Sequence, residues 1–294
     1  MASDDSELRN LQQRELFRTH TGFPFKRRGA TIPAAKLQIS KRTAKIFLMS
    51  ELLFIFAHQL NTTERPVYCN DLITMGGMKD SLMVLSGGMD STTMLYEFAE
   101  RIGLAVTFNY GSNHNAREIE CARENCRRLS VEFLVVDLPF IGSLFESSLL
   151  SGADAIPEGN YDDENMRSTV VPFRNGIMLA VAAGLAESRG LSRVMLANHG
   201  GDHAIYPDCR PGFVDAMSKA ISEGTYDHIT VQAPYTDISK ADIARRGASL
   251  GIDYSATYSC YKGGERHCGR CGTCTERRQA FIEAGIPDPT IYED

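Results

Sequence analysis

The sequence predicts an α/β protein: a doubly wound, parallel, five-stranded sheet followed by a small knuckle of four cysteines. Short apolar runs of five or six residues alternate, from residue 81 to residue 250, with longer segments whose apolar residues recur at helical spacing. Such strand–helix alternation favours a parallel sheet covered by helices on both faces. Four cysteines fall within residues 260–274 and indicate a compact structure of another kind after the sheet.

The apolar runs are expected to be strands, and the segments between them helices. Strands are predicted at residues 81–85, 104–109, 131–136, 193–197 and 228–232. Helices are predicted at residues 92–101, 119–129, 173–188, 212–222 and 240–250, where apolar side chains can share one face. The connection from Pro139 to Val170 is longer than an ordinary loop, so we expect it to be an active-site lid.

A glycine turn, SGGMDS at Ser86–Ser91, joins the first strand to the first helix. Where a strand turns sharply into a helix, several backbone N–H groups stay unpaired, and glycines let a phosphate oxygen approach them. The sequence lacks both the Gly-Lys-Ser/Thr ending of a Walker loop and the GxGxxG fingerprint. SGGMDS instead resembles the PP-loop of ATP pyrophosphatases. An ordinary turn capped by serine and aspartate is the alternative.

The composition is typical of a globular protein, since the 294 residues are 43% hydrophobic and 23% charged. The acidic balance of the main body favours a small-molecule ligand. Residues 78–294 hold 20 Lys/Arg against 30 Asp/Glu, so we expect no direct nucleic-acid partner. The longest apolar candidate, Ile46–Ala57, is interrupted by Ser50 and Glu51, so no membrane crossing is expected. No basic export signal opens the chain, and the scattered cysteines favour reduced thiols in the cytoplasm.

Three regions are predicted along the chain. Residues 1–77 are interpreted as an N-terminal extension, an accessory element or an upstream stretch, because they show no catalytic spacing. Residues 78–258 are predicted to form the ATP-binding α/β domain. Residues 259–294 are predicted to form a metal-binding segment that packs on the same domain.

The cysteine group has the spacing C-x7-C-x2-C-x2-C: Cys260, Cys268, Cys271 and Cys274. Four thiolates interleaved with glycines can close a tetrahedron around one cation, which points to structural Zn²⁺ with no open position. An iron–sulfur cluster is the alternative, but Arg278 and Gln279 stand where the bacterial cluster run has cysteine and proline. Unliganded cysteines are a further alternative.

The segment after the fourth strand, residues 198–211, is rich in glycine, acids and histidine. Asp202 or Asp208 is suited to accept hydrogen bonds from an amino-pyrimidinone edge, and Tyr206 to stack on it. Arg210 is suited to hold a carboxylate or a phosphate through two hydrogen bonds. A plain surface loop is one alternative, and a metal site at the two histidines of the segment is another.

Two cations are expected near the phosphates of a bound nucleotide. Arg174 lies in the first turn of its helix, and Lys240 opens the helix after the fifth strand. The Lys240 ammonium could neutralise charge that develops on departing pyrophosphate. The end of the second strand, Tyr110–His114, is where an adenine or ribose would rest in this architecture. Solvated side chains are the alternative for both cations.

In the order and spacing of these motifs, residues 78–294 resemble the 7-cyano-7-deazaguanine synthases, ATP-dependent enzymes that form a nitrile. The matching motifs are SGGMDS at 86–91, FNYGSNH at 108–114, VVPFRNG at 170–176, GDHAIYPDCRP at 201–211, SK at 239–240 and SC…CGRCGTC at 259–274. Two features depart from the family: Phe173 stands where a small or polar residue is expected, and residues 1–77 have no counterpart.

The resemblance implies that 7-carboxy-7-deazaguanine is adenylated on its carboxylate, that ammonia displaces AMP to give an amide, and that a second adenylation leads to the nitrile. Asp90, Lys240 and Arg174 are the expected catalytic residues, with Asp90 as the partner of Mg²⁺. The substrate-binding candidates are Asp202, Tyr206, Asp208 and Arg210. The candidates for binding ATP are Leu85, Ser86, Gly87, Gly88, Met89, Asp90, Ser91, Thr92, Thr93, Met94 and Leu95.

The nitrogen donor is expected to be free ammonium, because no glutaminase signature accompanies the α/β body. A homodimer is compatible with the sequence, which leaves the oligomeric state open. Two other functions stay open. A PP-loop enzyme that acts on tRNA, a thiolase or a lysidine-type ligase, would need a basic face. A non-catalytic zinc-ribbon protein would bind through residues 260–274 and would leave SGGMDS without a purpose.

Overall fold

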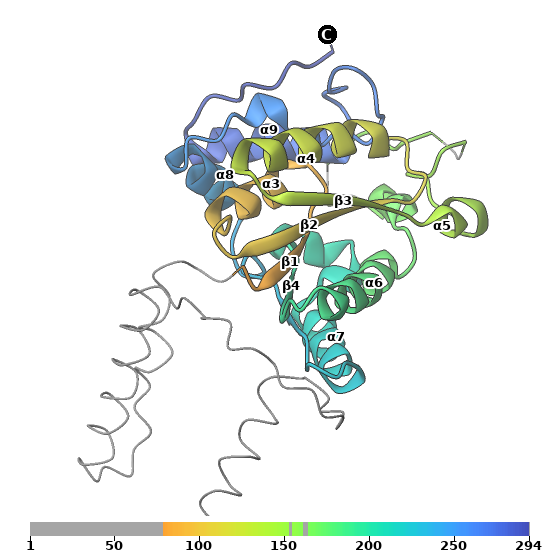
Figure 1. The fold of residues 1–294 in the computed structure, drawn as a ribbon. Helices are drawn as coiled ribbons and strands as arrows, with labels where there is room; N and C mark the ends of the chain where they lie inside the picture. The colour runs from red at the N-terminus through yellow and green to blue at the C-terminus, as the bar shows by residue number, and fades with distance from the viewer. Residues whose placement is uncertain (1–78, 153–154, 161–163, 294) are drawn as a thin grey trace, which may run out of the picture. The chain divides into compact units, whose positions relative to one another are not determined.

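The computed structural model describes residues 79–152, 155–160 and 164–293, and within them five parallel strands form one sheet in the order β3-β2-β1-β4-β5 (Figure 1). The strands are β1 (Ser81–Val84), β2 (Ile102–Asn109), β3 (Glu132–Asp137), β4 (Arg193–Met195) and β5 (Thr230–Gln232). The chain adds β2 and β3 on one side of β1, then returns to add β4 and β5 on the other. This doubly wound order confirms the predicted fold class.

Helices cover both faces of the sheet (Figure 1). Their bounds are α3 (Met89–Glu97), α4 (Asn115–Leu129), α5 (Pro139–Leu144), α6 (Arg174–Ser188), α7 (Pro211–Gly224), α8 (Lys240–Ser249) and α9 (Gly272–Ala284). Short 3₁₀-helices lie at η2 (Glu164–Thr169), η3 (Gly200–Ala204), η4 (Pro207–Cys209) and η5 (Tyr254–Ala256). The sequence analysis anticipated neither α5 nor α9.

Two hydrophobic cores lie on opposite faces of the sheet because successive strand residues point in opposite directions. Leu82 of β1 packs in the core that α6 and α7 cover, whereas Met83 and Leu85 pack in the core covered by α3, α4 and α8. A third cluster joins Met89 and Phe281, so α9 packs against the side of α3 and α8. The central strand β1 is therefore buried on both faces, and its end is a rigid base for the turn that follows.

The observed helix α3 begins three residues earlier than predicted. Gly88 has an extended backbone (φ −74°, ψ 173°) and caps the helix, so Asp90 and Ser91 lie in the first helical turn. The helix ends at Glu97, before the predicted end at Arg101. The strands β4 and β5 are likewise shorter than predicted. These differences move element ends by a few residues and leave the order of the elements unchanged.

The long connection between β3 and α6 is tied down where the structure describes it. The N–H of Asn113 donates to the carbonyl of Leu149 at 2.9 Å, and the N–H of Ser148 to that of Ser168 at 2.9 Å. Farther along, the N–H of Gly159 donates to the carbonyl of Arg270 at 3.2 Å. The connection thus reaches both the loop after β2 and the cysteine segment. Its action as a lid stays a prediction.

Within the described residues, the stretch Met166–Ser188 is long and apolar enough to span a membrane, judged by length and composition alone. Half of its most apolar window is buried inside the fold. Most of the stretch is α6, which packs against β1 and β4, as a helix of a protein core does. The expectations for residues 1–77 lie outside the described residues.

Candidate active site

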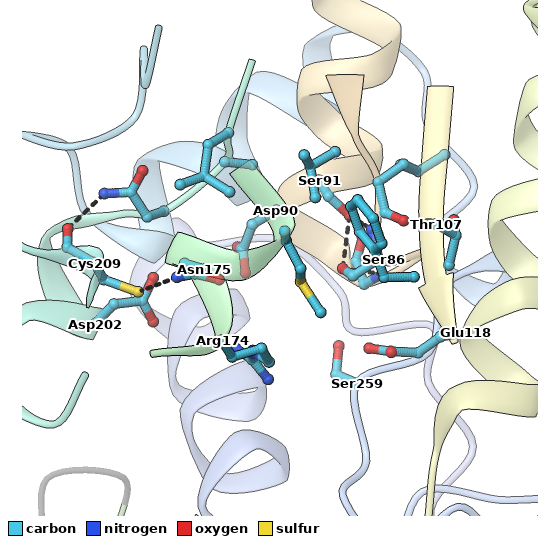
Figure 2. A pocket seen from close by; sticks show the side chains of 18 of the residues that line it. Ser86, Asp90, Ser91, Thr107, Glu118, Arg174, Asn175, Asp202, Cys209 and Ser259 are labelled. Carbon is cyan, nitrogen blue, oxygen red and sulfur yellow. Dashed lines mark hydrogen bonds between the residues drawn. The ribbon is translucent and has the colours of Figure 1, made fainter. Parts of the chain in front are cut away.

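The carboxyl ends of β1, β2 and β4 open into one cleft that holds about 1090 Å³ of empty space, its mouth included. In a doubly wound sheet this crevice, between the strands where the winding reverses, is the usual place for a ligand. Its walls come from the turn after β1, the loop after β2, the starts of α4, α6 and α8, the segment after β4 and residues 258–273. Figure 2 shows their polar side chains converging on this space.

The turn after β1 is held by its own serines. The Ser91 hydroxyl lies 2.9 Å from that of Ser86 and accepts the N–H groups of Ser86 and Gly87, both at 3.3 Å. Gly87 has φ +87°, and a Cβ there would lie 2.2 Å from the Glu118 carbonyl oxygen. A glycine is therefore required at this position, because the turn is left-handed there and packs directly on α4.

Only part of the predicted ATP-binding run faces the cleft. Leu85, Ser86, Gly88, Asp90 and Ser91 line it. Thr92, Thr93, Met94 and Leu95 are buried, and the last two belong to the core that α8 covers. The run thus divides into a face that can meet a nucleotide and a face that anchors α3.

A buried cluster of charges lies at the base of the cleft. Lys240 Nζ is 3.1 Å from Asp90 Oδ2 and 2.7 Å from Glu276 Oε2. Burial opposes ionisation of Asp90, but the charge and the hydrogen bond of Lys240 lower the pKa of that carboxyl overall. Burial likewise disfavours the charged Lys240, yet Asp90 and Glu276 raise its pKa. Lys240 is therefore a fixed positive charge beside the turn, held from two sides.

The pKa of Glu276 shifts upward, opposite to that of Asp90, although Glu276 makes the shorter contact with Lys240. Burial raises its pKa, and the charge of Lys240 offsets this only in part. His199 joins the same cluster: its Nε2 lies 3.8 Å from Asp90, 3.6 Å from Asp202 and 3.8 Å from Glu276. The imidazole is held in place because its Nδ1 accepts the backbone N–H of Gly201. The Asp202 carboxylate accepts the backbone N–H of His199 and so fixes the same turn.

Arg174 lies at the opposite wall of the cleft, at the start of α6. Its Nη1 donates to the Tyr110 hydroxyl at 3.1 Å, and its guanidinium lies 5.6 Å from the centre of that ring. Burial opposes its charge, but Tyr110 and Asp208 raise the pKa of the guanidinium overall. Lys240 and Arg174 thus place one cation on each side of the cleft.

Phe173, where the sequence analysis expects a small or polar residue, has a left-handed backbone at φ 54° and is 58% exposed. Its ring packs edge-on against Phe213 at 5.7 Å and lies over Gly176, where a Cβ would clash with it. The N–H of Asn175 then donates to Asp208 Oδ2 at 2.8 Å. Asp208 therefore caps the beginning of α6, and this turn directs Arg174 into the cleft.

The four predicted substrate-binding residues separate into two pairs. Asp202 and Tyr206 line the cleft, and the Tyr206 hydroxyl lies 2.9 Å from that of Thr169 and 2.8 Å from that of Tyr261. Asp208 and Arg210 are absent from the cleft lining. Asp208 is buried at the start of α6, and Arg210 is exposed, with its Nε donating to the His203 carbonyl. Substrate binding by any of the four stays a prediction.

Two acidic residues of the site, Glu118 and Glu276, were missed by the sequence analysis, which named His114 only as the end of the segment expected to hold an adenine or ribose. Burial raises the pKa of Glu118 to about 8, although Arg174 opposes the shift. Burial and the charge of Arg174 lower the pKa of His114 to about 4. The one sequence signal is the i, i+4 spacing of His114 and Glu118, which places them on one helix face. Glu276 stands in a charged run, TERR, that is typical of a solvated helix surface.

The four cysteines form the one cluster of possible metal ligands found in the described part of the chain. All are buried, and their sulfurs lie within 4.8 Å of one another. The Sγ atoms of Cys268 and Cys274 are 4.0 Å apart, as are those of Cys260 and Cys271. Tetrahedral bonds of ~2.3 Å place sulfurs ~3.8 Å apart, so the group fits a single thiolate-bound ion. Backbone N–H groups of Lys262, Cys268, Arg270 and Cys271 point at these sulfurs.

Helix α9 links this cysteine group to the cleft. It begins just after Cys271, carries Cys274 in its first turn and presents Glu276 to Lys240. The next residue, Arg277, is fully buried and donates to the Ser259 hydroxyl at 3.2 Å and to the Tyr254 carbonyl at 2.9 Å. Because Ser259 lines the cleft, Arg277 holds part of its wall in place.

The sequence of this chain is similar to those of known proteins. The sequence model of the family described as queuosine biosynthesis protein QueC matches residues 80–285. The 7-cyano-7-deazaguanine synthase of Porphyromonas gingivalis is 64% identical over 215 residues, which are 73% of this chain and 98% of the relative. The enzyme of the same name from Desulfotalea psychrophila is 49% identical over 217 residues, 73% of this chain and 99% of the relative. That of Methanoregula boonei is 48% identical over 216 residues, 72% and 99%.

Proposed function

The chain belongs to the family of queuosine biosynthesis protein QueC, and from this premise we propose that it forms 7-cyano-7-deazaguanine in an ATP-dependent, ligase-type reaction. The relatives that carry the name of this synthase match it over nearly their whole length. The structural observation that best supports the proposal is the buried contact of Lys240 with Asp90 and Glu276 beside the serine–glycine turn. This contact fixes a positive charge where pyrophosphate would depart. The tRNA-acting and zinc-ribbon alternatives have no comparable support.

The proposed substrate is 7-carboxy-7-deazaguanine, whose carboxylate attacks the α-phosphate of ATP. The backbone and hydroxyls of the turn at 86–91 hold the leaving phosphates, and Lys240 neutralises the charge that develops on them. Arg174, on the opposite wall, is placed to hold the anionic part of either substrate. The acyl-adenylate that forms must be shielded from water, which the walls of the cleft can do once substrates fill it.

The second half of the proposed reaction reuses the same site. Ammonium supplies the nitrogen, and AMP leaves as the amide forms. The amide oxygen then attacks a second ATP, and loss of AMP leaves the nitrile. Both activations have an oxygen nucleophile and a pyrophosphate leaving group, so a single cradle serves for both. Asp202 and Tyr206 are the proposed contacts for the deazaguanine ring, with Asp208 and Arg210 as the outer candidates.

Asp90 is the proposed partner of Mg²⁺. Its Oδ1 atom is buried and lacks a hydrogen-bond partner among the described residues, while Oδ2 contacts Lys240. A carboxylate oxygen that is still free suits this cation, whose chemical contribution is to neutralise charge on the phosphates of ATP. The four cysteines are proposed to hold Zn²⁺ as a closed structural site. Both assignments follow from the donor atoms that the chain offers.

We also propose that the reaction takes place in the cytoplasm. The free thiols of Cys121, Cys126 and Cys209 support this location, because such thiols persist in a reducing compartment. The functional proposal is tested by incubating the full chain with ATP, ammonium and 7-carboxy-7-deazaguanine, and by measuring pyrophosphate, amide and nitrile. We expect two pyrophosphates for each nitrile. A requirement for tRNA, or no product that depends on ammonium, would contradict the proposal.

A further inference from the structure

Glu118 has a buried carboxyl on the cleft wall. The proposed activation of ATP gives this carboxyl no role. Its side chain is 13% exposed and lines the cleft from the first turns of α4. Its own carbonyl supports Gly87, so the residue lies directly behind the phosphate-binding turn. In Figure 2 the carboxyl and the Ser259 hydroxyl lie in the same part of the cleft, with Arg174 across from them.

The three acids of the cleft wall differ in how their carboxyls are satisfied. Asp90 contacts Lys240, and Asp202 accepts the N–H of His199. Within the described residues, no hydrogen-bond donor reaches the Glu118 carboxyl, and its nearest titratable contact is His114 Nε2 at 3.7 Å. Among these three acids of the cleft wall, Glu118 is thus the one with no hydrogen-bond donor on either carboxyl oxygen, so it is available to a proton.

The reaction requires such a group, because nitrogen enters as ammonium with four hydrogens and leaves as a nitrile with none. Ammonium has no lone pair, so it must lose a proton before it can attack the acyl carbon. Lys240 and Arg174 cannot accept this proton, since both remain protonated beside their acidic or phenolic neighbours. Asp90 has its pKa lowered and is held by a cation, which makes it a weak base.

We propose, on the basis of the function proposed above, that Glu118 accepts the proton of ammonium at the cleft wall. One N–H bond breaks and a carboxyl O–H bond forms, which frees the nitrogen lone pair. That pair forms the C–N bond as the bond from the acyl carbon to AMP breaks. AMP leaves with the electron pair, and its phosphate accepts the second proton, which the nitrogen loses as the amide forms. The proton remains on Glu118 until the products leave and solvent re-enters the cleft.

The groups around Glu118 are consistent with this role. His114 lies just before α4, and Arg117 and Cys121 lie on it. Arg174 of α6 faces Glu118, and Tyr258 lies on the segment that precedes the cysteines. Burial raises the pKa of Glu118 to about 8, so the carboxylate gains population as pH rises through the neutral range. A base whose pKa lies near the working pH is the most effective one for a proton transfer of this kind.

The test compares Glu118→Gln with Glu120→Gln, a matched change on the same helix at a side chain that is 67% exposed. Two partial reactions are measured. Exchange of labelled pyrophosphate into ATP in the presence of 7-carboxy-7-deazaguanine reports the first activation and needs no nitrogen. Amide formation is then measured with ammonium, and hydroxamate formation with hydroxylamine, a nucleophile that is already neutral at pH 7.

For Glu118→Gln we expect pyrophosphate exchange within about threefold of wild type and ammonium-dependent amide formation lowered by roughly 100-fold or more. Hydroxamate formation should fall by less than about tenfold, because hydroxylamine needs no base before it attacks. Glu120→Gln should leave all three rates unchanged. Glu118→Asp, which keeps a carboxyl, should recover part of the ammonium reaction and serves if the glutamine variant fails to fold.

Three results would overturn the inference. Loss of pyrophosphate exchange in parallel with amide formation would mean that Glu118 binds the deazaguanine ring or ATP. Equal losses with ammonium and hydroxylamine, or no loss with either, would mean that it transfers no proton. Failure of the wild-type chain to exchange pyrophosphate would instead contradict the proposed function itself, so the two failures are distinguishable.

Discussion

Replacing Lys240 by methionine should be the most destabilising single change at the base of the cleft. The substitution keeps most of the unbranched apolar stem but removes the ammonium that lies 3.1 Å from Asp90 and 2.7 Å from Glu276. The side chains of the three residues are only 11%, 21% and 15% exposed, so water cannot take over the role of the ammonium. Two acids would then lie buried without a counter-ion.

Removal of one partner from a buried ion pair costs about 3–5 kcal/mol of unfolding free energy. For a folded unit of roughly 200 residues this corresponds to a fall of roughly 6–20 °C in the melting temperature. Without Lys240, burial and mutual repulsion would raise the pKa values of Asp90 and Glu276 above those of the unfolded chain. Acids of this kind destabilise the fold as pH rises through their raised pKa values, so the penalty should shrink as pH falls toward 4.

The assay is urea or thermal unfolding of wild type and Lys240→Met at pH 7.5 and pH 5, with Lys219→Met as the control. Lys219 is exposed on α7, so its loss should change stability by no more than about 0.5 kcal/mol. A destabilisation by Lys240→Met of less than about 1 kcal/mol at pH 7.5 would refute the reasoning. So would an equal penalty at both pH values, because the lost ammonium would then not be compensating for buried carboxylates.

The remaining predictions concern the turn and the cysteines. Asp90→Asn should lower kcat for nitrile formation by at least about 100-fold with metal content unchanged; turnover near wild type would rule out a role in catalysis. Cys271→Ser should lose the bound metal and unfold or aggregate, as seen by elemental analysis and thermal melting; a soluble, metal-loaded but slow variant would contradict a structural site. Gly87→Ala should raise KM for ATP at least about tenfold, because its Cβ would lie 2.2 Å from a backbone oxygen. Gly184→Ala is the control and should leave this KM unchanged, because the space around Gly184 is open. Equal kinetics for the two alanine variants would show that the turn tolerates a side chain.

Local signals were sufficient for the fold and for the motifs. Apolar runs of strand length, separated by helical repeats, predicted five parallel strands, because burial on both faces of a parallel sheet requires a continuous apolar run in each strand. The glycine turn was equally visible, since a left-handed backbone and a close approach of α4 both exclude a side chain at Gly87. The cysteine spacing predicted one compact group, and the structure brings those four sulfurs together.

The sequence by itself thus determined the five strands, the helices α3, α4, α6, α7 and α8, and the positions of the glycine turn and the cysteine group. Only the tertiary structure decided which acids and bases share the cleft. Glu276 meets Lys240 because α9 docks beside α8, and Glu118 lines the cleft because α4 packs behind Gly87. Asp208 caps α6 and Arg210 is exposed, so neither lines the cleft. These contacts join residues far apart in the chain, and packing between elements, which no local pattern encodes, selects them.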